Sequence, residues 1–76
     1  MGYSAKVEME FFVKDERYLP GQIGRDLMIF DQPMLFPATT GILVLSIDGN
    51  PSGWIVAIHP MSKPSRHVTG TFSNID

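Results

Sequence analysis

The sequence predicts an all-β fold, a small sandwich or open barrel of four to five short, mostly antiparallel strands. Short apolar or alternating runs are separated by clusters of Gly, Pro, Asn and Asp at intervals of about eight to twelve residues. No stretch shows the apolar period of about 3.6 residues that marks an amphipathic helix. Because a chain of 76 residues has room for one core, residues 1–76 are predicted to form a single small β domain.

The first predicted strand is residues 6–14, KVEMEFFVK. Its odd-numbered residues from Val7 to Val13 are apolar, whereas its even-numbered residues are charged except at Phe12. Alternation with a period of two is typical of a strand with one face in the core and one in water. Phe12 interrupts the polar face, so we expect it either to cover a strand edge or to contact a partner.

The next segments contain many turn-forming residues. Residues 15–25 are predicted to be a connection, because Pro20-Gly21 and Gly24 interrupt regular structure. Residues 27–30, LMIF, fit a second strand. Pro33 and Pro37 then bracket three apolar residues, and this spacing predicts an extended, irregular segment that closes at residues 39–41.

The middle of the chain carries almost no charge. Between Gln32 and Ile58 the only charged residue is Asp48, so most of this third is expected inside the fold or against a partner. Residues 42–47, ILVLSI, are apolar on both faces apart from one serine, which predicts a central strand or one buried between layers. Residues 54–58, WIVAI, are the natural antiparallel neighbour of this strand.

The end of the chain is predicted to hold one more strand. Residues 60–64, PMSKP, form a linker, and residues 66–72, RHVTGTF, alternate in the manner of a strand. Residues 73–76 are expected to fray, as chain ends commonly do.

The stretch DGNPSGWI, which begins at Asp48, resembles the start of an EF-hand calcium loop. That loop needs a bidentate carboxylate at its twelfth position, where this chain has His59, and Pro51 lies inside the loop. Asp48-Gly49 between apolar runs is also a strong hairpin signal. We therefore predict a hairpin turn that binds no metal.

Composition excludes several classes of protein. Six Lys and Arg against eight Asp and Glu give a net charge of −2, so nucleic-acid binding is not expected. The absence of cysteine rules out disulfides and thiolate metal sites. No signal peptide or transmembrane segment is visible, which predicts a cytoplasmic protein that does not bind membranes.

A few side chains are candidates for ligand binding. The basic and histidine residues near the C-terminus could hold an anion or simply form a solvated loop, and the only tryptophan suits a ligand platform or packing under a loop. The tentative binding residues are His59, Lys63, Arg66, His67 and Trp54. No carboxylate lies near either histidine in sequence and no nucleophile–base pattern is present, so we expect neither an enzyme nor a cofactor.

The size of the chain points to self-association. A domain this small is marginally stable alone, and this one has no disulfide and no convincing metal loop to support it. We therefore expect a homo-oligomer, most simply a dimer, that acts as a non-catalytic interaction module with a possible protein partner; the alternative is a β-barrel that binds a small ligand or nucleic acid. The tentative interface residues are Phe12, Met34, Leu35 and Phe36.

Overall fold

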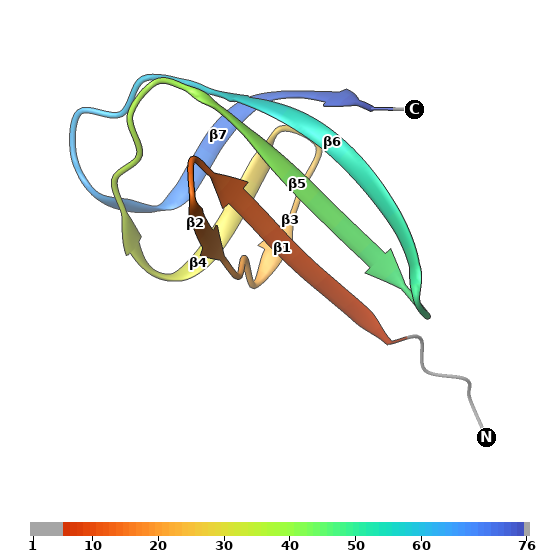
Figure 1. Ribbon diagram of the computed structural model, residues 1–76. Coiled ribbons are helices and arrows are strands. Elements are labelled where there is room, and N and C mark those ends of the chain that lie inside the picture. Colours follow the sequence, from red (N-terminus) through yellow and green to blue (C-terminus); the bar gives the residue numbers. More distant parts are fainter. Residues whose placement is uncertain (1–5, 76) are drawn as a thin grey trace.

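The computed structural model describes residues 6–75 and confirms the all-β class. Seven strands form one antiparallel sheet in the order β2-β1-β5-β6-β7-β4-β3 (Figure 1). They are β1 (Val7–Val13), β2 (Glu16–Tyr18), β3 (Gln22–Ile23), β4 (Leu27–Met34), β5 (Thr40–Ile47), β6 (Asn50–Ile58) and β7 (Ser65–Asn74). Within residues 6–75 no helix is long and apolar enough to span a membrane.

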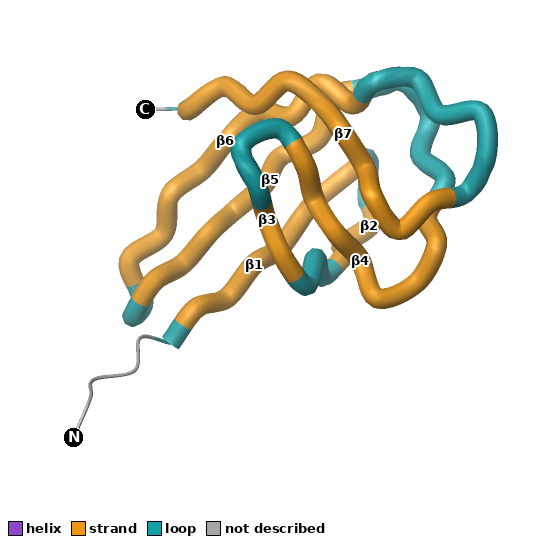
Figure 2. Tube along the Cα trace, turned by 180° about the vertical axis from the view of Figure 1, so that it is seen from behind, coloured by secondary structure: helices purple, strands orange, loops and turns teal. Residues whose placement is uncertain are grey.

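The sheet folds over on itself because β7 pairs with a strand on each side of the fold, β6 on one side and β4 on the other. The second half of β7 pairs with β6, in register from Ile58 opposite Gly70 to Trp54 opposite Asn74. The first half of β7 pairs with β4 instead. As a result β4 and β3 lie across from β1, β5 and β6, as seen from both sides (Figures 1 and 2). The first layer is β1, β5, β6 and the second half of β7, and the second layer is β3, β4 and the first half of β7.

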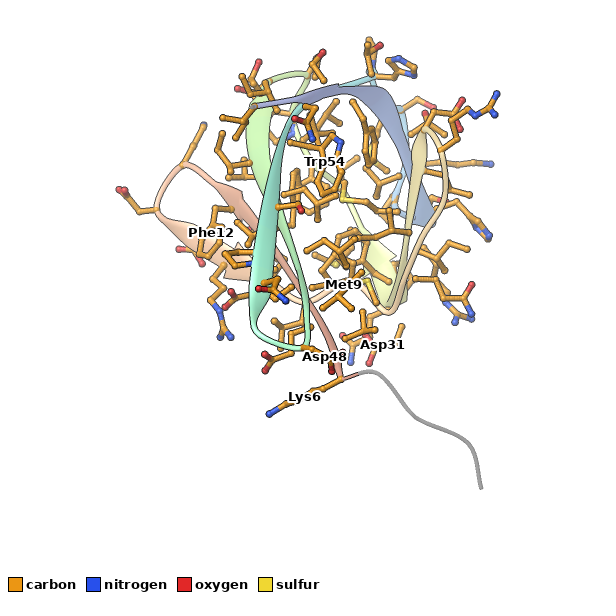
Figure 3. All side chains as sticks on the ribbon, turned by 90° about the vertical axis from the view of Figure 1, so that its right-hand side faces the viewer. Lys6, Met9, Phe12, Asp31, Asp48 and Trp54 are labelled. Carbon is orange, nitrogen blue, oxygen red and sulfur yellow. The ribbon has the colours of Figure 1, made fainter. Side chains whose placement is uncertain are left out.

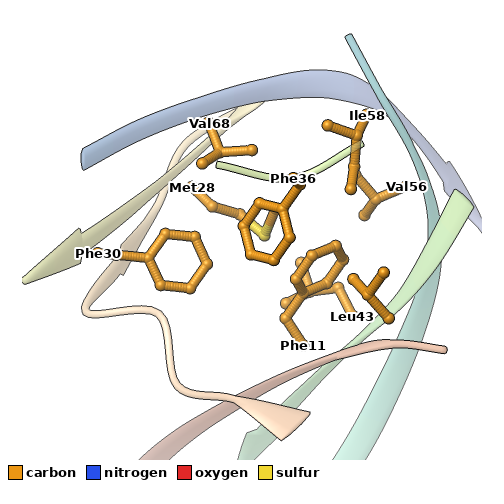
Figure 4. Close-up of a cluster of buried hydrophobic side chains, with 9 residues drawn as sticks. Phe11, Met28, Phe30, Phe36, Leu43, Val56, Ile58 and Val68 are labelled. Atoms are coloured by element: carbon orange, nitrogen blue, oxygen red, sulfur yellow. The ribbon is translucent and has the colours of Figure 1, made fainter. Parts of the chain in front are cut away.

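The core fills the space between these layers. Each strand of the two layers turns alternate side chains inward, as the pleat requires. Eight of these side chains are buried, and Phe36 from the segment between β4 and β5 joins them: Phe11, Val13, Met28, Phe30, Leu43, Val56, Ile58, Val68 and Phe36 (Figure 4). No polar or charged residue among the described ones is buried, so the core is wholly apolar.

Two short strands lie where a plain connection was predicted. Val13 pairs with Glu16, which leaves Lys14 and Asp15 as a two-residue turn that starts β2. Lys14 has a φ of 56°, a left-handed conformation that lysine rarely adopts. The usual Gly or Asn signal is therefore missing from this turn, and no local pattern predicts β2 there.

The segment between the two prolines also differs from the prediction. β4 continues through Pro33 to Met34, although its register with β7 is irregular between Ile29 and Met34. The next residues turn inward and deliver Phe36 into the core, where it is 5% exposed. The prediction that Phe36 belongs to an interface is therefore wrong, because the chain buries this ring by itself.

The β5–β6 hairpin is longer than the two apolar runs suggested. Its turn is Asp48-Gly49 alone, since Ile47 pairs with Asn50 and Ser46 pairs with Pro51. Both turn residues have positive φ, 53° and 83°, as a type I′ turn requires. The hairpin turn is thus confirmed, but residues 50–53 belong to β6 and not to the turn.

The C-terminal end is also more regular than expected. β7 extends to Asn74, and the backbone N–H of Ile75 donates a hydrogen bond of 3.0 Å to the carbonyl of Gly53. The predicted fraying is therefore wrong for residues 73–75, while Asp76 lies outside the described residues.

Candidate functional site

A pocket opens between the two layers beside the only tryptophan. Its volume is about 290 Å³, near the lower end of the roughly 300–1,000 Å³ that is usual for small-molecule sites. In Figure 3 Trp54 points from its strand into the space between the layers. The residues that line the pocket are Ile23, Gly24, Arg25, Leu43, Leu45, Trp54 and Phe72.

Three strands of the first layer supply the floor of this pocket. Leu43 of β5 lies opposite Trp54 of β6, and Leu45 follows Leu43 on the same inward face. Phe72 of β7 is inward-facing as well, because it lies opposite buried Val56 on β6. The inward side chains of neighbouring strands therefore form one continuous apolar surface.

The turn between β3 and β4 forms the opposite wall. The backbone N–H of Gly24 donates a hydrogen bond of 2.7 Å to the carbonyl of Leu27, which closes a tight turn around Arg25. Arg25 is exposed and is the only charged residue in the lining. Within residues 6–75 its guanidinium forms no ion pair or hydrogen bond; the one ion pair found there joins Arg17 to Glu10.

The outward face of the first layer carries a second feature, an apolar patch. Phe12, Ile42 and Ile55 lie in one row across β1, β5 and β6. Val44 lies beside this row, opposite Gly53 of β6. The Ile75 side chain covers Gly53, since a Cβ added to Gly53 would lie 3.0 Å from Cδ1 of Ile75. We call the residues Phe12, Ile42, Val44, Ile55 and Ile75 the outer patch.

The outer patch is accessible to solvent in the single chain. Ile42 is 38% exposed, Ile55 41% and Ile75 49%. The prediction that residues 42–47 form a central strand holds, since β5 lies between β1 and β6. However, the second layer lies only on its inward side, and among residues 6–75 no element covers its outward face.

The predicted cluster of histidine and basic residues lies mainly on the outside of β7. Each ring nitrogen of His59 is within hydrogen-bond distance of a threonine hydroxyl, Nδ1 at 3.3 Å from Thr69 and Nε2 at 3.2 Å from Thr71. His67 pairs with Ile29 of β4 and is exposed. These threonine contacts link the end of β6 to β7 and give the His59 ring a structural role.

The remaining members of that cluster do not gather around one point. Arg66 uses its Nε–H to donate a hydrogen bond of 3.1 Å to the carbonyl of Phe30, and Lys63 lies exposed in the β6–β7 loop. Trp54 faces the pocket between the layers, whereas His59 is on the outward side of the first layer. The five tentative binding residues thus do not form one site.

The predicted interface residues are also separated. Phe12 is half-buried in the outer patch and lies on the side of β1 away from the second layer (Figure 3). Leu35 is 56% exposed, while Met34 is half-buried against the core. Only Phe12 and Leu35 therefore remain as clear candidates for contact with another molecule, and they belong to different surfaces.

The geometry of the β5–β6 turn differs from that of a calcium loop. The Asp48 carboxylate accepts a hydrogen bond of 2.9 Å from the backbone N–H of Lys6, and its own N–H donates to the Lys6 carbonyl. At about 3.3 Å per residue of strand, His59 lies roughly 30 Å from Asp48. Residues 6–75 contain no group of three or more His, Asp or Glu side chains that could hold a metal ion.

The sequence showed some of these features and missed others. The doubly apolar run at residues 42–47 was a signal for the outer patch, because one of its faces had to lie outside a small core. Nothing local marked Ile23, Arg25 or Phe72 as pocket residues, since only the fold brings them to Trp54. In the comparisons with known proteins, no protein-family model, curated protein or solved structure matches this chain.

Proposed function

We propose that this protein is a non-catalytic interaction module that forms a homodimer through the outer patch. The observation that carries the proposal is the row of Phe12, Ile42 and Ile55 across three neighbouring strands, on a sheet face that no other described element covers. An antiparallel sheet with one face in water normally has polar residues on that face. Contiguous apolar side chains in this position are typical of a surface that binds another protein.

The shape of the outer patch suits a second copy of the same chain. A two-fold axis close to Ile42 places Phe12 of one copy near Ile55 of the other, so each aromatic ring meets a branched aliphatic side chain. Two sheets that pack face to face in this way form a sandwich with interdigitating side chains. Two-fold dimers are the commonest soluble oligomers, and their contact uses the same patch on both copies.

Stability gives a second reason for a dimer. A domain of this size buries only about 60% of the surface that its unfolded chain exposes. The chain has no cysteine and therefore no disulfide to compensate. Covering Ile42, Ile55 and Ile75 in a dimer removes further apolar area from water, which stabilises the fold by roughly 25 cal/mol per Å².

Light scattering after size exclusion tests this proposal. We expect a mass near twice the 8.5 kDa of one chain at tens of micromolar protein, and a mass near 8.5 kDa for the variants Ile42→Glu and Ile55→Glu. Leu35→Glu adds the same charge at an exposed apolar residue outside the outer patch, so it is the matched control and should remain dimeric. A monomeric wild-type protein excludes the dimer, and dissociation by Leu35→Glu alone moves the contact to the β4–β5 segment.

A further inference from the structure

We propose that the pocket beside Trp54 binds a small amphipathic carboxylate, with its apolar part between the layers and its carboxylate at Arg25. This site is separate from the outer patch. Leu43, Leu45 and Trp54 face inward on the same strands whose outward residues form the patch. The proposal therefore does not depend on the dimer.

The apolar part of the ligand is specified by the lining. Five of the seven lining residues are large apolar or aromatic side chains from β3, β5, β6 and β7. Leu45, Trp54, Phe72 and Ile23 are only half-buried, so the folded chain leaves part of this apolar surface in water. A ligand with an alkyl or aryl body removes that surface from water, which is the usual driving force for such sites.

The apolar surface also continues beyond the pocket. Val7 and Met9 of β1 lie opposite Ile47 and Leu45 of β5 on the same inward face, where the β5–β6 hairpin extends away from the core. Val7 and Ile47 are 48% and 45% exposed. In Figure 3 Met9 points into the space between the layers, below Trp54. An elongated alkyl chain therefore has an apolar path on which to lie.

The charge of the ligand is specified by Arg25. It is the only charged side chain in the lining, and among residues 6–75 no carboxylate neutralises it. A guanidinium presents a planar set of donors that matches the two oxygens of a carboxylate. The pocket lining contains no Asp or Glu that would repel an anion.

Intrinsic fluorescence gives a direct test, because Trp54 is the only tryptophan. Hexanoate, octanoate and decanoate are titrated separately, with octanol as the uncharged match for octanoate. We expect a saturable change in Trp54 emission whose affinity rises about fourfold for each methylene until the apolar path is filled. Octanol is expected to bind about threefold more weakly than octanoate. The difference is modest because Arg25 is exposed.

Variants locate the binding. Arg25→Gln should reduce octanoate affinity to that of octanol, whereas Lys63→Gln, which removes a positive charge far from the pocket lining, should leave octanoate affinity unchanged. Leu45→Glu should abolish binding of the carboxylates, because it places a negative charge in the floor of the pocket. The backbone amide signals of each variant, compared with those of the wild type, establish that it is folded.

The outcomes separate cleanly. Saturable binding that depends on chain length and on Arg25, with amide shifts at residues 23–25 and 43–45, supports the site. No saturable change at millimolar ligand overturns it. Equal affinities for octanoate and octanol, or equal effects of Arg25→Gln and Lys63→Gln, overturn the assignment of the carboxylate to Arg25.

Discussion

Phe36 contacts three other aromatic rings in the core. Its ring centroid is 5.7 Å from that of Phe11 and 5.0 Å from that of Tyr18, both edge-on, and 5.8 Å from that of Phe30. These rings come from β1, β2 and β4, so the single side chain joins both layers. Edge-on pairs add about 0.5–1.5 kcal/mol each beyond the area that they bury.

We expect Phe36→Ala to lower the free energy of unfolding by about 3–5 kcal/mol, which is enough to unfold much of a domain this small. Phe36→Leu keeps most of the volume and should lower it by about 1–2 kcal/mol, which urea denaturation can measure. A folded Phe36→Ala protein with unchanged stability and a lower mass in light scattering would instead return Phe36 to the interface.

At Gly41 the backbone of β5 lies unusually close to residues of β1. A Cβ at this position would lie 2.6 Å from Cζ of Phe11 and 2.8 Å from the carbonyl oxygen of Phe12. The ring of Phe11 therefore occupies the space that any other residue would need. This contact explains why a glycine interrupts an otherwise apolar strand.

Gly41→Ala is expected to lower the free energy of unfolding by about 1–3 kcal/mol, because the added methyl must displace a buried ring or the backbone of β1. Gly21→Ala is the control. Its Cβ would lie 3.6 Å from the Ile29 carbonyl oxygen, an ordinary contact, so its stability should change by less than about 0.5 kcal/mol. Similar urea midpoints for the two variants would contradict this account of Gly41.

At the scale of the element, the β5–β6 hairpin depends on its two-residue turn. Asp48 and Gly49 both adopt positive φ, and the Asp48 carboxylate accepts a hydrogen bond from the backbone N–H of Lys6. The turn therefore also fixes the start of β1 beside the end of β5. On the side of β6 that faces β7, the last hydrogen bond within the described residues joins Ile75 to Gly53. Pro51 lies beyond this bond, where β6 is an edge and the missing N–H of proline costs no ladder hydrogen bond.

Asp48→Ala should lower the free energy of unfolding by about 1–2 kcal/mol, since alanine disfavours positive φ and cannot accept the Lys6 hydrogen bond. Asp48→Asn should be nearly neutral, because asparagine adopts this conformation readily and keeps an acceptor oxygen. Thermal unfolding of the two variants measures the difference. If both lose stability equally, the carboxylate charge and not the turn geometry is what matters.

The same hairpin predicts the response to calcium. Because β6 is extended, the residues that would complete a calcium loop are far from Asp48 and cannot surround one ion. We expect calorimetric titration to show no calcium binding tighter than millimolar. Tighter binding that disappears in Asp48→Ala would overturn this prediction.

At the scale of the whole molecule, the folded sheet encloses the core residues on its inward face, and no other element within residues 6–75 covers the outward face of β1, β5 and β6. β7 crosses from one layer to the other and closes only one side of the core. Residues 6–75 therefore complete a core but leave Ile42 and Ile55 exposed. The proposed dimer links stability to protein concentration.

We expect the thermal unfolding midpoint of the wild type to rise with protein concentration, since mass action favours the dimer over unfolded chains. The midpoint of Ile42→Glu should be lower and independent of concentration, and Leu35→Glu should follow the wild type. Scanning calorimetry over a range of concentrations measures this. A wild-type midpoint that does not change with concentration would contradict a dimer coupled to folding.

Local sequence determined which residues share a face and where the chain reverses. Alternation in residues 7–13 predicted β1 and its inward side, and Asp48-Gly49 predicted the hairpin, because both signals act between near neighbours in the chain. The apolar run at residues 42–47 predicted a central strand for the same reason. None of these three signals depends on contacts with distant segments.

Tertiary structure alone decided which faces are covered and which distant residues meet. The pairing of β7 with both β6 and β4 puts Phe36 into the core and brings Arg25 beside Trp54. The short strands β2 and β3 exist only because β1 and β4 offer them edges to pair with. Such contacts depend on long-range pairing, and a local pattern records only that a side chain is apolar, not what will cover it.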